Sequence, residues 1–279
     1  MNTQPDLSVI IVSYKTPDLV RRCLDSLYVD AGSFQLETFV VDNASNDGTV
    51  ELLRREYPHV RVIPLSRNAG FGAANNAAIS KANGRYWLLL NSDAFVQAGA
   101  LEAAVRHMDE VARAGVGGAR LTGIDGDWQP SACMFPSPLN DILLLSGLSA
   151  RFPDSHFLTR MNRRWADPAE PAEADWVPGA FMILRPEAMQ RAGLFFDESF
   201  FLYYEEVDLC QRIRHAGYRV FYWPDIRVTH LGGESARRSG PRQLTSFGRQ
   251  LALWRFRSEW IYYRKHHQLL VAWVAHQLE

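Results

Sequence analysis

The sequence has few cysteines and no long hydrophobic run. Its 279 residues include three cysteines, Cys23, Cys133 and Cys210, and this odd, widely spaced set argues against a disulfide framework or a cysteine-based zinc site. Residues 1–14 have no basic region, and their apolar run is too short for a signal peptide or a membrane span. These absences favour a reducing compartment, and we expect a cytoplasmic protein.

An excess of charge of either sign is also missing. There are 30 Lys and Arg residues against 31 Asp and Glu residues, so the net charge predicts neither nucleic-acid binding nor a surface for acidic substrates. No G-x-G-x-x-G follows the first apolar run, and no G-x-x-x-x-G-K-[ST] is present. The dinucleotide-binding and P-loop classes therefore lack their phosphate-binding glycines.

Apolar runs and helical patterns alternate over the first 120 residues. A helix is predicted to begin at Thr16-Pro17, which supply an N-cap and a first-turn proline. Such alternation is typical of a parallel, doubly wound α/β sheet. The predicted strands span residues 7–13, 37–41, 60–64 and 86–90.

Polar residues follow these strands, at the edge where doubly wound sheets bind ligands. Ser13, Tyr14, Asp42 and Asp93 all lie at such strand ends, so the first half is predicted to bind a nucleotide. Asp42 could accept a hydrogen bond from the imide N–H of uracil or thymine, or bind ribose hydroxyls. Alternatively, it is an Asx-turn residue.

Asp93 has two interpretations of its own. It could ligate a divalent cation, with Asn91 supporting it directly or through water, because hard cations prefer oxygen ligands. Alternatively, it caps a helix that begins near Ala98.

Residues 122–178 contain seven prolines and no sustained period. They are either an insertion that shapes an acceptor site or an irregular surface excursion. Regularity returns with a predicted strand over 180–185, a short helix to Gly193 and a helix over 206–216.

An acidic pair, Glu205-Glu206, opens this last helix, and His230 lies beyond the following strand. The pair is a candidate general base and the histidine a candidate metal ligand. We expect the helix dipole to keep the pair ionised. The alternatives are helix capping for the acids and a structural role for the histidine.

Several segments, taken in order, resemble inverting family 2 glycosyltransferases with the GT-A fold, and most closely their bacterial rhamnosyltransferase-like branch. The resemblance covers roughly residues 7–235. After the strand at 7–13, the segments are VVDNASNDGT, LSRNAGFGAANNAAI, LLLNSDA, WVPGAFMILR, FFLYYEEVDLCQRIRHAGY and VTHLGGES.

The resemblance implies a donor site in the N-terminal half. Asn91-Ser92-Asp93 stands where the family has its Asp-x-Asp metal motif, with Asn in place of the first Asp. Asp93 and His230 would then hold Mg or Mn from opposite sides. The predicted nucleotide-binding residues are Ser13, Tyr14, Asp42, Arg67, Asn68 and Ser92.

The resemblance also implies an acceptor site in the C-terminal half. Glu206, the second member of the acidic pair, is the expected catalytic base rather than Glu205, although many relatives have the shorter Asp there. Trp176 and Gly179-Ala180 match a segment that frames the acceptor and donor sugars, while a core Trp is the alternative. The Q-x-x-R-W signature of processive synthases is absent after His230, which favours addition of a single sugar.

Basic and aromatic residues dominate the C-terminal segment. From Ser235 to His267 there are eight Lys or Arg residues and one acid. Arg237, Arg238 and Arg242 could clamp a diphosphate or form a solvated loop. Interleaved with the basic residues are Trp254, Phe256, Trp260, Tyr262 and Tyr263.

This composition suits a membrane interface with anionic lipid. We therefore expect peripheral contact with the inner face of the plasma membrane. A helix packed on the domain is the alternative, and nucleic-acid binding is a weaker third option. The predicted organisation is a GT-A domain over 1–235, divided at residue 120 into nucleotide-binding and acceptor halves, a helical tail over 236–277 and a vector remnant at 278–279.

The sequence therefore predicts a metal-dependent hexosyltransferase of cell-wall or polysaccharide biosynthesis. It would transfer one sugar with inversion from a nucleoside diphosphate-sugar, with dTDP-L-rhamnose as the leading donor, to a hydroxyl of a glycan or lipid-linked glycan. A nucleotidyltransferase is the first alternative, although the loop at residues 13–17 lacks its Gly- and Arg-rich character. A non-catalytic sugar-nucleotide-binding module is the second.

Overall fold

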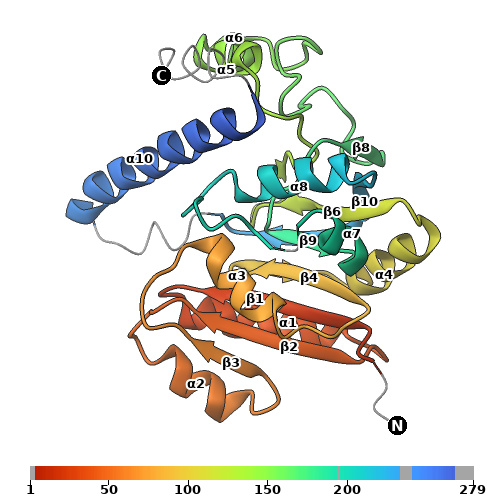
Figure 1. Cartoon of the computed structure of the whole chain (residues 1–279), viewed down its shortest axis with the longest axis vertical. Coiled ribbons are helices and arrows are strands. Elements are labelled where there is room, and N and C mark those ends of the chain that lie inside the picture. The colour runs from red at the N-terminus through yellow and green to blue at the C-terminus, as the bar shows by residue number, and fades with distance from the viewer. Residues whose placement is uncertain (1–3, 194, 233–240, 268–279) are drawn as a thin grey trace.

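The computed structural model describes residues 4–193, 195–232 and 241–267 (Figure 1). These residues form one mixed sheet, with the order β3-β2-β1-β4-β9-β6-β10-β5, while β7 pairs with β6 and β8 with β10. The strands are β1 (Leu7–Ser13), β2 (Leu36–Asp42), β3 (Arg61–Pro64), β4 (Tyr86–Asn91), β5 (Ala94–Val96), β6 (Ala114–Thr122), β7 (Trp128–Gln129), β8 (Ala172–Ala174), β9 (Phe181–Leu184) and β10 (Arg219–His230).

Helices cover both faces of this sheet (Figure 1). Helices α3 and α8 pack on the same face of the sheet, and α10 lies beside α8. The helices are α1 (Pro17–Asp30), α2 (Thr49–Glu56), α3 (Phe71–Ile79), α4 (Ala100–Glu110), α5 (Pro138–Leu145), α6 (Leu148–Arg151), α7 (Pro186–Arg191), α8 (Glu205–His215) and α10 (Pro241–His266).

The N-terminal strands are parallel, as the alternating pattern predicts. In β1, every residue except Val12 is buried, because helices cover both of its faces. The register places Ser13 opposite Asp42 on β2 and Val12 opposite Asn91 on β4. Three strand ends therefore lie level at one edge of the sheet.

Beyond β4 the sheet is mixed. Strand β9 is antiparallel to both of its neighbours, β4 and β6. Strand β10 is parallel to β6, and β5 pairs antiparallel with the last residues of β10. The two halves thus share one continuous sheet; the division at residue 120 remains a prediction.

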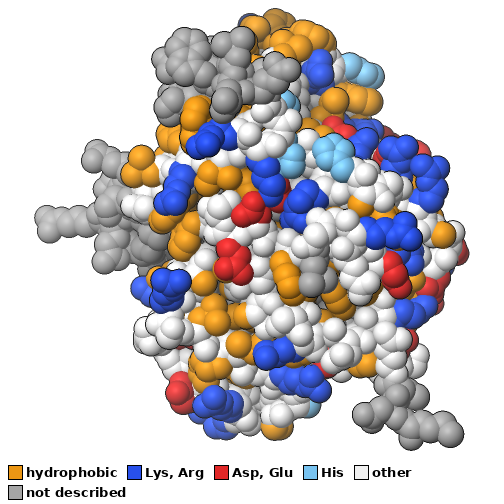
Figure 2. Space-filling view, viewed as in Figure 1, with side chains coloured by type: hydrophobic (Ala, Val, Ile, Leu, Met, Phe, Trp, Pro, Cys, Tyr) orange, Lys and Arg blue, Asp and Glu red, His pale blue; other side chains and the backbone are white. Residues whose placement is uncertain are grey.

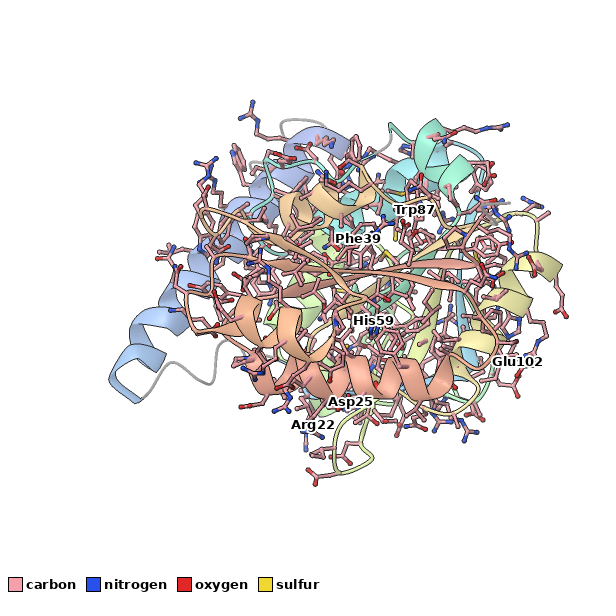
Figure 3. The ribbon with its side chains drawn as sticks, turned by 90° about the horizontal axis from the view of Figure 1, so that it is seen from below. Arg22, Asp25, Phe39, His59, Trp87 and Glu102 are labelled. Atoms are coloured by element: carbon pink, nitrogen blue, oxygen red, sulfur yellow. The ribbon has the colours of Figure 1, made fainter. Side chains whose placement is uncertain are left out.

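Apolar side chains fill a separate core on each face. Phe39 and Trp87 belong to the core packed against α3, α7 and α8, and Figure 3 shows both on the α3 side of the sheet. Arg22 and Asp25 mark α1 on the opposite side (Figure 3), where α1 and α4 cover the other core.

Residues 122–178 contain more order than their composition predicts. Strand β7 pairs with β6 and strand β8 with β10, and α5 and α6 lie above the sheet (Figure 1). An antiparallel bridge between Cys133 and Trp176 joins the beginning of this segment to its end.

The tail corrects one expectation. Tyr262 and Tyr263 are fully buried, and with Tyr204 and Val207 they form a third small core. Two of the five aromatics assigned to a membrane interface are therefore core residues, and the packed-helix alternative holds for this part of α10. In the described part of the chain, no helix has the length and apolarity that crossing a membrane requires.

Candidate active site

A chain of buried hydroxyls joins the strand ends. The Ser13 Oγ lies 3.2 Å from Thr16 Oγ1, which lies 3.0 Å from Ser92 Oγ. Thr16 occupies the N-cap position of α1 as predicted, but its side chain makes no capping bond. These contacts bring two predicted nucleotide-binding residues together, with Thr16 between them.

The two carboxylate oxygens of Asp42 differ in their contacts. Its Oδ2 accepts the backbone N–H of Ser45 at 3.2 Å, as in an Asx turn. Its Oδ1 is buried and has no partner among the described residues. A buried acceptor without a partner is costly, so Oδ1 is suited to receive a donor from a ligand.

Asn43 holds the turn that carries the predicted nucleotide-binding residues Arg67 and Asn68. Its Nδ2 donates to Asn68 Oδ1 at 3.0 Å, and its Oδ1 accepts the backbone N–H of Ala69 at 2.8 Å. These bonds hold Asn68 beside the end of β2. Arg67, the other predicted residue here, is exposed at the same turn, and Tyr14 is partly buried at the end of β1.

Asp93 and His230 face one another because β5 pairs with the end of β10. The register places His230 opposite Ala94, and the His230 Nε2 lies 3.5 Å from Asp93 Oδ1. Helix α4 begins at Ala100 with Gly99 at its N-cap. The alternative that Asp93 caps a helix is therefore wrong, because strand β5 separates it from α4.

Gln129 determines which ring nitrogen of His230 is hydrogen-bonded and which one faces Asp93. Its amide Nε2 donates to the His230 backbone carbonyl at 2.8 Å, so the oxygen of the same amide accepts at 2.9 Å from His230 Nδ1. Nδ1 therefore carries a proton, and Nε2 is the nitrogen that faces the Asp93 carboxylate.

A divalent cation fits between these two groups. A carboxylate oxygen and an imidazole nitrogen that face one another are both acceptors, and Mn or Mg takes such ligands. Within the described ranges, no cluster of three or more His, Cys, Asp or Glu side chains forms a metal site. The nearby Asn91 donates its backbone N–H to the Ala180 carbonyl at 3.1 Å.

The acidic pair opens α8 from a strained loop. Tyr203 and Tyr204 both have φ of 68°, a left-handed conformation that non-glycine residues rarely adopt. Glu205 is buried at 2% exposure. Glu206 is partly buried and accepts a hydrogen bond from the backbone N–H of Gly179. Among the described residues the Oε2 atoms of both have no partner.

Burial governs the ionisation of this pair. It raises the pKa of Glu205 well above 4.5, with the Glu206 charge adding to the effect, and it raises the pKa of Glu206 too. Backbone N–H groups at the start of α8 lower both pKa values, but less than burial raises them. Burial therefore opposes the helix dipole, which is expected to favour the ionised pair.

The predicted sugar-framing segment contacts Glu206 at Gly179. A Cβ there would lie 3.0 Å from the Phe71 ring, so a larger residue would displace this contact. Trp176 is partly buried, packs against the core and donates its Nε1 to the Met134 carbonyl at 2.9 Å. These contacts favour the core interpretation of Trp176. Arg237 and Arg238 lie outside the described residues.

Comparison with known proteins assigns this arrangement to a family. Glycosyl transferase family 2 matches residues 8–166, more than half of the chain. The chain belongs to this family. Over 255 residues, the glycosyltransferase is 29% identical to the N-acetylglucosaminyl-diphospho-decaprenol L-rhamnosyltransferase of Mycobacterium tuberculosis, covering 86% of this chain and 80% of that protein.

Solved structures confirm the GT-A fold of this glycosyltransferase. The mannosyltransferase PcManGT of Pyrobaculum calidifontis, in complex with GDP-Man and Mn2+, matches 99% of this chain and 70% of its own at 18% identity, with a TM-score of 0.59. The S. aureus protein TarS in complex with UDP matches 82% of this chain and 62% of its own at 19% identity, with a TM-score of 0.56.

Proposed function

We propose that this glycosyltransferase transfers one sugar, with inversion, from a pyrimidine nucleoside diphosphate-sugar to a hydroxyl of a lipid-linked glycan. The leading donor is dTDP-L-rhamnose, because the Mycobacterium tuberculosis relative is an L-rhamnosyltransferase. The acceptor named in that relative is a sugar on a lipid diphosphate, which supports the same acceptor class here.

One observation supports transfer most directly. The Glu206 carboxylate, with one oxygen unpartnered among the described residues, is held by Gly179. The adjoining Ala180 carbonyl accepts from Asn91, which begins the predicted Asn91-Ser92-Asp93 metal motif. A base is thereby joined through two backbone contacts to the site expected to hold the donor.

The mechanism follows from these positions. Asp42 Oδ1 would accept the imide N–H of the pyrimidine, while Arg67 and Asn68 would contact the nucleotide. Glu206 would remove the acceptor hydroxyl proton as that oxygen bonds to the anomeric carbon from the face opposite the leaving group. The bond from the anomeric carbon to the diphosphate breaks, and its electron pair leaves on the diphosphate, so configuration inverts.

Asp93 and His230 would hold a divalent cation in this scheme, with Gln129 fixing the tautomer of His230. A cation bound there supplies charge neutralisation for the diphosphate leaving group. Metal dependence is thus part of the proposal, and Mn2+ in the Pyrobaculum calidifontis complex is consistent with it.

Replacing the base tests the proposal. Glu206→Gln keeps the shape but loses the proton acceptor, so transfer should fall about 10²- to 10⁴-fold while donor affinity changes only a few-fold. Donors are first selected by thermal shift of sugar nucleotides with Mn2+ or Mg2+, since a ligand of the native state raises the unfolding midpoint.

Glu205→Gln is the matched control, because Glu205 is the more deeply buried of the pair. A larger loss in Glu205→Gln would move the base to that residue. A wild-type chain that binds donor but transfers no sugar would instead be a non-catalytic binding module. Family membership itself favours sugar transfer over the nucleotidyltransferase alternative.

We further propose that the protein acts at a membrane surface, because a lipid-linked acceptor resides there. On α10, Leu253 and Phe256 are exposed at 61% and 40%, and the neighbouring Arg257 is also exposed. Such a face suits contact with anionic lipid.

A further inference from the structure

The segment between β6 and β9 contains a recess that the mechanism above does not use. Two cavities of about 400 and about 490 Å³ share His156, Arg163 and Trp165 in their walls. The second is lined by these three residues together with Met134, Phe157 and Arg160. This second cavity is called the Arg160–Arg163 cavity below.

The Arg160–Arg163 cavity combines positive charge with aromatic rings. Its lining has two guanidinium groups and an imidazole, and no carboxylate. The His156 and Trp165 rings are stacked, with their centroids 4.0 Å apart. The guanidinium of Arg163 lies over Trp165 at 5.5 Å, and that of Arg160 over Phe157 at 6.0 Å. The rings therefore hold both cations in place.

Three N–H groups in this wall have no acceptor among the described residues. The Nε atoms of Arg160 and Arg163 and the Nε1 of Trp165 are buried N–H groups without a partner in the described part of the chain. Native proteins rarely leave such donors unsatisfied. Phosphate oxygens are the acceptors that guanidinium groups bind most effectively.

An exposed apolar surface adjoins the cavity. Leu148, Phe152 and Phe157 are exposed at 42%, 52% and 56%, and Phe157 is itself part of the cavity wall. Figure 2 shows hydrophobic side chains at the top of the molecule, where Figure 1 places α5 and α6. Large exposed apolar side chains that gather in this way mark a binding surface.

Cys133 lies near both the cavity and the Glu206 carboxylate. Burial raises the pKa of the Cys133 thiol to about 12; the Glu206 charge adds to this rise and the Arg163 charge opposes it. Cys133 therefore lies within electrostatic range of both groups. Its neighbour Met134 lines the cavity and accepts the Trp176 indole N–H, so Trp176 adjoins this wall.

We propose that the Arg160–Arg163 cavity binds the phosphate groups of a lipid-linked acceptor, with the lipid lying along the apolar surface and the sugar reaching Glu206. This inference rests on the proposed function. It assigns an acceptor-binding role to Arg160, Arg163 and Trp165, and it makes the phosphate a recognised part of the acceptor.

Acceptor kinetics test the assignment. The acceptors are a sugar on farnesyl diphosphate and the same sugar as a farnesyl glycoside without phosphate. For the wild-type protein, KM should be lower for the diphosphate. Replacing both arginines, as Arg160→Gln/Arg163→Gln, should raise that KM about tenfold or more and leave the KM of the phosphate-free acceptor within about twofold.

Arg164→Gln is the control, because Arg164 is the exposed neighbour that lines neither cavity. If the double variant fails to fold, Arg160→Gln alone preserves the Arg163 bond to the Glu173 carbonyl. Equal KM values for the two acceptors in the wild type, or an unchanged KM in Arg160→Gln, would overturn the assignment while transfer itself continues. Absence of wild-type transfer to any acceptor would instead refute the proposed function.

Binding without turnover separates the lipid diphosphate from free phosphate. With the donor site saturated by dTDP and Mn2+, farnesyl diphosphate should perturb tryptophan fluorescence, and Arg160→Gln should weaken its binding about tenfold. Inorganic pyrophosphate should bind the wild type more weakly, because it lacks the lipid. Tighter binding of pyrophosphate, or binding of farnesyl diphosphate that Arg160→Gln leaves unchanged, would contradict the proposal.

Discussion

At the scale of single residues, Gln129 makes His230 usable as a ligand. Its side chain bonds both the backbone carbonyl and the Nδ1 of His230, which leaves Nε2 facing Asp93. No sequence pattern indicates this, since the contact joins residues 101 positions apart and a glutamine beyond a strand has no distinctive spacing.

Gln129→Leu should therefore weaken metal-dependent donor binding. Loss of a group that orients a ligating histidine costs about 10- to 100-fold in metal affinity, and Asp93→Ala, which removes a ligand, should cost more. Calorimetric titration of Mn2+ in the presence of dTDP measures both. Gln97→Leu is the control, because the exposed side chain of Gln97 donates to Thr229 in the neighbouring strand and not to His230. Equal effects of Gln129→Leu and Gln97→Leu would leave Gln129 without this role.

The pKa of Glu205 depends on burial, which the sequence does not reveal. The position at a helix start lowers this pKa, whereas burial in the fold raises it. Since the folded-state pKa is raised above 4.5, the stability contributed by protonated Glu205 is complete below about pH 4.5 and is lost as pH rises through the folded-state pKa.

Glu205→Gln should accordingly raise the unfolding temperature, and by more at pH 8 than at pH 5. Thermal unfolding at the two pH values measures the difference. Exposed Glu102 on α4, labelled in Figure 3, provides the control Glu102→Gln. A wild-type chain that is more stable than Glu205→Gln at pH 8 would contradict the direction of this shift.

At the scale of elements, the sequence predicts which helices and strands form better than it predicts what they pack against. The apolar run at 7–13 coincides with β1, and the helix predicted over 206–216 corresponds to α8, because burial on both faces and helical periodicity are local patterns. The partner of α10 is not local. Its tyrosines and arginines suit a membrane or a protein surface equally, and only the fold shows that Tyr262 donates to Gln211 of α8 at 2.5 Å.

Asp208 joins α10 to the helix that presents the acidic pair. Its carboxylate is fully buried and meets Arg212, Lys265 and His266 at 2.8, 2.8 and 2.7 Å. Burial alone would raise the pKa of Asp208, but the hydrogen bond from His266 and the bonds and charges of Arg212 and Lys265 outweigh it and lower the pKa to about 2. The stability it contributes is present above about pH 4 and is lost as pH falls through about 2.

Asp208→Ala should lower the free energy of unfolding at neutral pH by about 3–5 kcal/mol, since it removes the buried carboxylate that pairs with Arg212 and Lys265. Urea denaturation measures this. Asp197→Ala removes the partly exposed partner of Lys265 and should cost about 1 kcal/mol or less. Similar costs for the two variants would show that α10 is not held through Asp208.

At the scale of the whole molecule, the buried tyrosines change how membrane contact must be tested. Deleting the tail would remove part of a core, so charge reversal on its exposed face is the better experiment. Arg257→Glu/Arg264→Glu should weaken binding to anionic vesicles about tenfold or more, because each arginine near an anionic surface contributes about 1 kcal/mol.

Co-sedimentation measures this binding, which should also decline as salt rises. Arg54→Glu/Arg55→Glu on α2, at the bottom of the molecule in Figure 1, is the charge-matched control. If both double variants bind like the wild type, or if neutral and anionic vesicles bind equally, the electrostatic contact is refuted.

The continuity of the sheet has a consequence for how such enzymes diversify. Strand β4 leads into the predicted metal motif, and the segment that contacts Glu206 leads into β9, its direct neighbour. The Arg160–Arg163 cavity is lined by residues of the stretch between β7 and β8, whereas Gln129 lies on β7 and Gly179 follows β8. Descendants could therefore exchange the stretch between β7 and β8, acquire a new acceptor and keep the residues that position the metal ligand and the base.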